Sequence, residues 1–433
     1  MASTATASLG ALPFDAAAPI WADVEPVPQA DTESPLCPIL YAPEYSKAMD
    51  LLRAFMLKQE RSARALALTE HLVKLNPSNY TVWDYRAQLL VAGADDDGED
   101  IESAAGGAGG GSGSDSNARR RKALEAELAL LDDMAAGSMK NYQIWQQRKR
   151  VVSALGDPSR ELEFTASILD IDAKNYHTWV YRQWVLCFFG GLPPTSALRD
   201  TSTASAPPPV PVPAPTYSAP SAVQPNSGEA EAEAAQGTFP QLWDGELAFT
   251  DGLLESDVRN NSAWNHRFFV LFASGRARET VADREGTNEL EWVRREVGFA
   301  KSKIALTPNN ASAWNYLRGI CRLNPSQSPT PFTTSASSFA LSLIPSHAEA
   351  TATPTVDSGG KTPWLALEWL LDCEEERAKV LVAGGKAGDS GEGGLADIEQ
   401  VVQVILQRLL IADPMRKRYW HYKAERTMTL LGR

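Results

Sequence analysis

Three cations in this 433-residue chain each stand directly before an asparagine that can begin a helix: Lys140, Lys174 and Arg259. The positive end of the helix dipole disfavours a cation at that position. The placement becomes favourable when an anion binds at the helix start, as phosphate groups do. The pattern therefore marks these residues as candidates for binding an anion. It does not separate them from one another, and a solvated surface cation is the alternative interpretation of each.

The three asparagines belong to a unit that recurs along the chain. Tryptophan follows asparagine by four residues in five copies, and arginine follows tryptophan by three in the first four. The copies are Asn79–Arg86, Asn141–Arg148, Asn175–Arg182, Asn260–Arg267 and Asn310–Leu317, with a degenerate sixth around Trp420. The second copy differs from the others because it carries Lys140 and Gln143 together.

The recurring unit predicts helical hairpins. Asn141 and Asn175 are 34 residues apart, which is the length of one hairpin in a helical-repeat protein. Asparagine is a good N-cap, and proline two residues earlier, at Pro77 and Pro308, can end the preceding helix. Runs such as 63–75 and 161–169 carry apolar residues at helical spacing. We therefore predict an all-α fold of stacked hairpins, with the tryptophans packed between helices.

Low-complexity segments lengthen the intervals between copies. They lie at about 93–117, 191–239, 324–362 and 384–394 and are rich in Gly, Ser, Thr or Pro. Such segments bury too little apolar surface to offset chain entropy, which predicts disordered loops. We expect one helical-repeat domain over 21–433 that carries these insertions, after a disordered tail at 1–20.

Composition narrows the class of protein. The net charge is −13, and there is no basic stripe of the kind that binds nucleic acid. The four cysteines stand far apart without a CxxC pair, which argues against a disulfide framework or a zinc site and favours a reducing compartment. The first 20 residues lack a basic signal-peptide region, and no apolar run is long enough to span a membrane. These features predict a cytoplasmic protein without membrane insertion.

Several stretches together resemble the α subunit shared by protein farnesyltransferase and protein geranylgeranyltransferase type I. They are 21–29 (Trp-Ala-Asp-Val-Glu-Pro-Val-Pro-Gln), 58–65, 76–86, 140–145, 157–164, 172–179 and 257–264. The likeness runs in register from about Trp21 to Trp420 and is broken only by the insertions. The Asn-Tyr-x-x-Trp pattern alone would also fit the Rab geranylgeranyltransferase α subunit, whereas the 21–29 stretch favours the first family.

The resemblance implies a right-handed superhelical crescent of TPR-like hairpins that wraps around a separate β subunit. That β subunit would hold the catalytic Zn²⁺, in keeping with the lack of a ligand cluster in this sequence. The heterodimer would transfer farnesyl, or geranylgeranyl with another β subunit, from the isoprenoid diphosphate to a cysteine thiol. The acceptors would be C-terminal CaaX proteins such as small GTPases, and Mg²⁺ would serve farnesyl transfer.

The resemblance also separates the cations. It implies that Lys140 is the catalytic residue that contacts the prenyl diphosphate, where a cation lowers the barrier as charge grows on the leaving group. Gln143 would donate its amide N–H to the carboxylate of the CaaX peptide. Tyr142 and Tyr80 would line the peptide site. Tyr176 and His177 match positions that face the same cavity, although a histidine beside an aromatic ring is commonly a packed residue.

Other matches to the family suggest structural roles. Asn175, Trp179, Arg148 and Arg182 match residues whose loss harms the family enzymes, and we expect them to hold helix pairs together. Leu317 stands where the repeat predicts arginine, and the sixth copy keeps little beyond Trp420. We therefore expect no active-site residue from the C-terminal end.

Two other functional classes fit the repeat pattern. One is a Rab-type subunit with an escort protein and a different β chain. The other is a non-enzymatic helical-repeat adaptor that has lost its site. The presence of Lys140, Tyr142 and Gln143 together argues against the adaptor.

Overall fold

The computed structural model describes residues 18–30, 36–37, 39–91, 113–192, 233–274, 289–322, 331–344, 362–383 and 395–432. These residues form helices joined by turns and include no strand. The all-α prediction is therefore confirmed. The chain divides into two compact units, the first ending at Asp244 and the second containing the helices from Gly245 onward.

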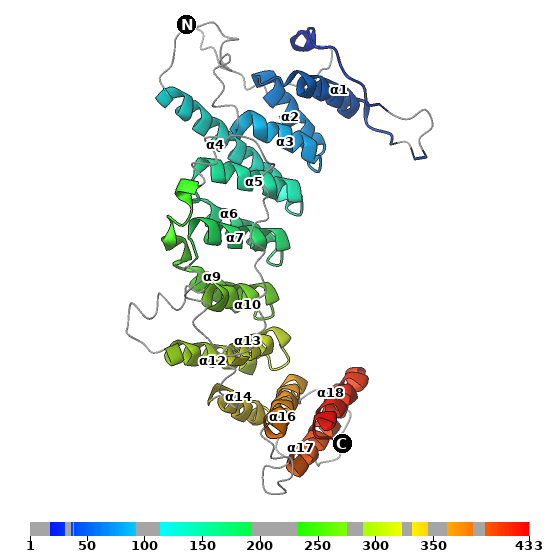
Figure 1. Ribbon diagram of the computed structural model, residues 1–433, viewed down its shortest axis with the longest axis vertical. Coiled ribbons are helices and arrows are strands. Elements are labelled where there is room, and N and C mark those ends of the chain that lie inside the picture. Colours follow the sequence, from blue (N-terminus) through cyan, green and yellow to red (C-terminus); the bar gives the residue numbers. More distant parts are fainter. Residues whose placement is uncertain are drawn as a thin grey trace. The chain divides into compact units, whose positions relative to one another are not determined.

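The first unit is a stack of helical hairpins (Figure 1). Its helices are α1 (Pro43–Lys58), α2 (Ala63–Leu75), α3 (Tyr80–Val91), α4 (Gly113–Ser138), α5 (Tyr142–Leu155), α6 (Glu161–Ile171) and α7 (Tyr176–Phe189). Short 3₁₀ turns lie at Pro19–Trp21 and Pro240–Trp243. The hairpins are α2–α3, α4–α5 and α6–α7, and α5 packs against both α3 and α7. One continuous apolar core joins them.

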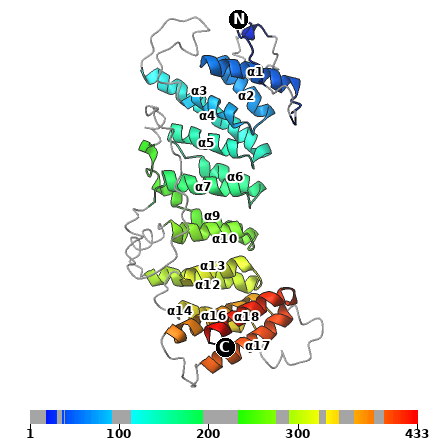
Figure 2. The same cartoon turned by 45° about the vertical axis from the view of Figure 1, so that its right-hand side comes forward.

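The second unit repeats this arrangement and ends in a helical cap (Figure 2). Its helices are α9 (Glu246–Ser256), α10 (Asn261–Phe268), α12 (Glu289–Leu306), α13 (Ala311–Arg322), α14 (Pro331–Ser342), α16 (Trp364–Ala383), α17 (Leu395–Ala412) and α18 (Lys417–Leu430). A π-helical turn at Phe269–Ala273 follows α10, and a 3₁₀ turn at Pro414–Arg416 precedes α18. Helix α10 packs on α13, whereas α16, α17 and α18 pack on one another.

The predicted insertions are partly wrong. Helix α14 lies inside the segment 324–362, because Ala336 and Ala340 bury their methyl groups against the core of the second unit despite the polar composition. Helix α4 already begins at Gly113, within 93–117. Residues 233–239 are also ordered, since the backbone N–H of Phe239 donates to the carbonyl of Phe189 at 2.9 Å. Most of the remaining insertion residues, like 1–17 of the tail, lie outside the described residues.

Each repeat tryptophan closes the turn that leads into its own helix. In the first five copies the indole Nε1 donates to the carbonyl six residues earlier, at 2.8–3.0 Å. The accepting carbonyls are those of Pro77, Met139, Ala173, Val258 and Pro308. Trp420 departs from the pattern, because its indole donates to Asp413, seven residues earlier. The predicted role of the tryptophans in packing is confirmed. Each indole also makes a hydrogen bond that the sequence did not predict.

The repeat asparagine joins its own helix to the preceding repeat. Asn175 accepts from the backbone N–H groups of His177 (3.0 Å) and Thr178 (3.2 Å), as an N-cap does. Its Nδ2 donates to the carbonyl of Met139 at 3.3 Å, the carbonyl that also accepts the Trp145 indole. The carbonyl of Met139 thus connects two successive repeats.

A buried ion pair joins the arginine of one repeat to the next hairpin. Arg148 contacts Glu161 at 2.7 Å, and both side chains are 1% exposed. Glu161 also accepts from the hydroxyl of Tyr181 at 2.6 Å, a residue of the following repeat. The same arrangement occurs at Arg267, Glu296 and Tyr316. The expected structural role of Arg148 is therefore confirmed.

Arg182 behaves as the repeat predicts, whereas the position of Leu317 departs from it. Arg182 donates to the carbonyl of Leu162 at 2.7 Å and to Thr165, both on the partner helix of its hairpin. Where Leu317 replaces the arginine, Arg318 takes over an ionic role by donating to Asp372 at 3.0 Å.

We predict that Arg148→Ala destabilises the first unit by about 3–5 kcal/mol, because it leaves the Glu161 carboxylate buried without its cation. Arg121→Ala is the matched control, since its pair with Glu125 is 54% exposed on both sides and contributes at most about 1 kcal/mol. Urea denaturation followed by tryptophan fluorescence measures both. Equal losses would contradict the structural role of the buried pair.

Candidate functional site

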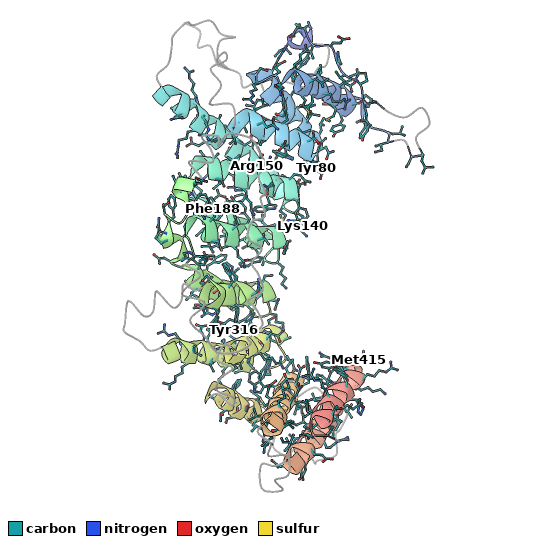
Figure 3. The ribbon with its side chains drawn as sticks, in the orientation of Figure 1. Tyr80, Lys140, Arg150, Phe188, Tyr316 and Met415 are labelled. Carbon is teal, nitrogen blue, oxygen red and sulfur yellow. The ribbon has the colours of Figure 1, made fainter. Side chains whose placement is uncertain are left out.

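The predicted site residues of the second repeat lie at the start of α5. Asn141 caps this helix, and its Oδ1 accepts from the backbone N–H of Gln143 at 2.9 Å and of Ile144 at 3.2 Å. The cap places Lys140 just outside the helix and Tyr142 and Gln143 in its first turn. Figure 3 shows Lys140 on the same edge of the first unit as Tyr80, which begins α3.

An open hollow of about 470 Å³ lies between the turns of the first and second repeats. Its lining comprises Pro77, Ser78, Gly137, Ser138, Met139, Lys140, Asn141, Tyr142 and Gln143. The two turns are held together because Nδ2 of Asn141 donates to Oγ of Ser78 at 3.0 Å. The hollow therefore contains Lys140, Tyr142 and Gln143 but not Tyr80.

Lys140 is available to a ligand. Its side chain is 76% exposed, and its Nζ lies 3.5 Å from Oδ2 of Asp172. Asp172 belongs to the α6–α7 turn, one repeat later. The ammonium group thus stands at the edge of the hollow beside a single carboxylate.

Aromatic rings of the third repeat lie next to Lys140. Tyr142 and His177 meet edge to face, with ring centroids 4.2 Å apart, and Tyr176 meets His177 at 5.8 Å. Both tyrosines are 66% exposed. Partial burial lowers the pKa of His177 below its ordinary value, and the charge of Lys140 lowers it further. The structure therefore brings Lys140, Tyr142, Tyr176 and His177 together.

The other two cations differ from Lys140. Lys174 lies in the α6–α7 turn, outside the lining of the hollow. Arg259 belongs to the second unit, where its backbone N–H is held by Asp257 at 2.9 Å. Of the three cations, Lys140 is thus the one that is exposed and also lines this hollow.

Sequence reasoning missed Asp172. A side chain that accepts from the backbone two residues ahead stands three positions before the repeat asparagine at Asn76, Asp172 and Asp257. That recurrence identifies a turn residue. The pairing with Lys140 crosses from one repeat to the next and follows from the stacking of the hairpins alone.

No group of three or more His, Cys, Asp or Glu side chains could hold a metal ion within the described ranges. The Zn²⁺ that the resemblance implies would be held by the β subunit and not by this chain. Every helix in the described part of the chain is too short or too polar to span a bilayer.

Comparison with known proteins identifies the repeats. The sequence model of the protein prenyltransferase α subunit repeat matches residues 62–92, 124–155, 158–189, 243–274 and 293–323. The chain is 33% identical to the protein farnesyltransferase/geranylgeranyltransferase type-1 subunit α of Dictyostelium discoideum, over 72% of this chain and 71% of that protein. The chain belongs to this α-subunit family. The pea homologue of the same name is 30% identical over 70% of this chain and 65% of its own length.

More distant relatives and the fold agree with this membership. The bovine geranylgeranyl transferase type-2 subunit α is 24% identical over 60% of this chain and 34% of its own length. The type-1 relatives are thus the better match, as the 21–29 stretch predicts. A chain of Candida albicans protein geranylgeranyltransferase-I, solved in complex with GGPP, has the same fold with a TM-score of 0.56 and 24% identity. That likeness covers 94% of this chain and 98% of the solved one.

We predict that Lys140→Ala raises the pKa of His177. A nearby cation disfavours the protonated imidazole, so its removal eases protonation, whereas the remaining burial keeps the pKa below about 6.5. NMR titration of the histidine ring protons measures the shift. Arg121→Ala, which removes a cation at the other end of the α4–α5 hairpin, should leave it unchanged. An unchanged pKa in Lys140→Ala would show that the two side chains do not interact.

Proposed function

We propose that this chain is the α subunit of a heterodimeric protein prenyltransferase. The enzyme transfers a farnesyl group, or a geranylgeranyl group with another β subunit, from the isoprenoid diphosphate to the cysteine thiol of a C-terminal CaaX protein. The observation that carries the proposal is the exposed Lys140 beside Gln143 at one capped helix start, in a member of the type-1 α-subunit family.

Lys140 supports the departure of the diphosphate. The reaction breaks the bond between carbon 1 of the isoprenoid and the diphosphate oxygen, while the cysteine sulfur, having lost its proton, forms the new bond to that carbon. Negative charge grows on the leaving oxygen as the bond breaks, so an ammonium group there binds the transition state better than the substrate. Neutral His177 and the hydroxyls of Tyr142 and Tyr176 can add hydrogen bonds beside it.

Gln143 binds the end of the acceptor peptide. Its side-chain amide has no hydrogen-bond partner among the residues that the structure describes, so its N–H donors are available to a carboxylate. Gln143 lines the same hollow as Lys140, which supports a peptide terminus bound next to the diphosphate. Tyr80 is 73% exposed at the start of α3, in the preceding repeat, and would extend the peptide site beyond the hollow.

A β subunit completes the site. The reacting groups of the α chain lie on an open surface, whereas electrostatic catalysis is strongest where water is excluded. The partner would cover this edge, hold the Zn²⁺ for which the described α residues offer no ligand cluster, and set the length of the isoprenoid. Mg²⁺ would assist farnesyl transfer at the diphosphate.

We predict that Lys140→Ala lowers turnover of the heterodimer by about 10²–10³-fold, the usual effect of removing one group that stabilises developing charge. Single-turnover transfer from farnesyl diphosphate to a CaaX peptide measures it. The heterodimer and its zinc content should not change. The matched variant Lys174→Ala should cost much less, and a wild-type rate in Lys140→Ala would refute the assignment.

Gln143→Ala should raise KM for the CaaX peptide by at least about tenfold, because a hydrogen bond to a charged carboxylate is lost. Steady-state kinetics with the free-acid peptide measures the change. A peptide with an amidated C-terminus is the control, and its KM should be nearly the same for wild type and variant. If both peptides lost affinity equally, Gln143 would not be the residue that contacts the carboxylate.

A further inference from the structure

The ion pair between Lys140 and Asp172 links two successive turns at the proposed site. Lys140 precedes α5, Asp172 ends α6, and their charged atoms are 3.5 Å apart. Asp172 is 31% exposed, so its carboxylate is partly shielded, whereas the lysine projects into solvent. The carboxylate of Asp172 is therefore the fixed partner of the pair, and the ammonium of Lys140 is the movable one.

The two oxygens of Asp172 have separate roles. Oδ1 accepts from the backbone N–H of Lys174 at 3.2 Å and shapes the turn, whereas Oδ2 faces Lys140. The turn does not require a charge, because neutral Asn76 makes the same contact with the N–H of Ser78 at 3.1 Å. The negative charge at Asp172, which Asp257 also carries at the equivalent position, is thus not needed to form the turn.

We propose that Asp172 is a positioning residue that holds the ammonium of Lys140 beside the hollow and yields it to the prenyl diphosphate. This inference rests on the proposed function of Lys140. A lysine side chain has four rotatable bonds, and an exposed one without a partner samples many positions. The carboxylate confines the ammonium near its working position, and the weakness of an exposed pair lets a ligand displace it.

The diphosphate displaces Asp172 from the ammonium of Lys140, but the displacement costs free energy. It carries more negative charge than one carboxylate, so it attracts the ammonium more strongly. To bind the diphosphate, the ammonium of Lys140 must first leave Asp172, and the loss of that ion pair opposes the exchange. The carboxylate therefore weakens binding of the prenyl diphosphate and of the released diphosphate alike, which keeps the product from occupying the site.

Asp172→Asn in the full heterodimer tests this proposal, because asparagine keeps the turn and removes only the charge. We expect farnesyl diphosphate to bind about threefold to tenfold more tightly at low ionic strength. The gain should shrink in about 0.5 M salt, where exposed charges are screened. Fluorescence titration with farnesyl diphosphate measures affinity, and inhibition by inorganic diphosphate should strengthen in parallel. If Asp172 only shaped the turn, the asparagine variant would bind farnesyl diphosphate as tightly as the wild type does.

Asp157→Asn is the matched control. Asp157 makes the same kind of turn, accepting from the N–H of Ser159 at 3.1 Å, and pairs with exposed Arg121 at 3.2 Å. It lies beyond the opposite end of α5 from Lys140. Its change should leave the affinity for farnesyl diphosphate at the wild-type value.

The double variant Lys140→Ala/Asp172→Asn isolates the coupling between the two residues. Most of the gain from Asp172→Asn should vanish when Lys140 is absent. If the full gain persisted, Asp172 would act by general repulsion and the positioning role would be wrong. Unchanged or weaker binding in Asp172→Asn would likewise overturn it.

Failure of this inference is distinguishable from failure of the proposed function. Should Lys140→Ala alone lose turnover while Asp172→Asn leaves affinity unchanged, only the role of Asp172 is wrong. Should Lys140→Ala keep wild-type turnover, the assignment of Lys140 itself fails. Asp172→Ser provides a second neutral variant if the asparagine protein does not assemble, since Ser138 occupies the equivalent position in the second repeat.

Discussion

In the first five repeats, the hydrogen bond from the indole to the carbonyl six residues earlier is the constraint on which the architecture depends. The accepting carbonyl lies in the turn just past a helix end, outside the hydrogen bonds of that helix, and a buried indole N–H needs an acceptor. One contact satisfies both groups and fixes the path of the turn. At Met139 and Val258, the asparagine of the next repeat donates to the same carbonyl, so the turn also positions that repeat.

The turn between the two helices of a repeat depends only on its asparagine and tryptophan. The positions beside the asparagine can therefore vary without disturbing the turn. The residue before it is Ser78, Lys140 or Lys174 in the first unit, on turns of the same construction. The buried Arg–Glu–Tyr contacts lie farther along the helices and stabilise the hairpins independently. The proposed chemistry at the edge and the stability of the core thus belong to different residues of one repeat.

Sequence was a reliable guide wherever one repeat determined its own structure. The N-caps, the tryptophan packing and the shared face of Trp145 and Arg148 follow from local spacing, and all occur as predicted. Helix α14 was missed because small residues such as Ala336 and Ala340 give a weak apolar signal, although a close-packed groove can bury them. Asp172 was missed for another reason, since its partner comes from a different hairpin.

The proposed site is exposed on the α chain alone but would be covered by the β subunit in the heterodimer, and this difference changes the strength of its ionic contacts. Two unit charges 4 Å apart interact by about 1 kcal/mol in water but by about 4 kcal/mol near a protein surface of lower effective dielectric. Lys140, 76% exposed, can therefore exchange partners easily while the edge is open. In the proposed heterodimer the β subunit lowers the local dielectric, and the same ammonium then interacts far more strongly with the diphosphate. The weak, reversible ion pair on the α chain and the strong catalytic contact in the proposed heterodimer would then be two states of one side chain.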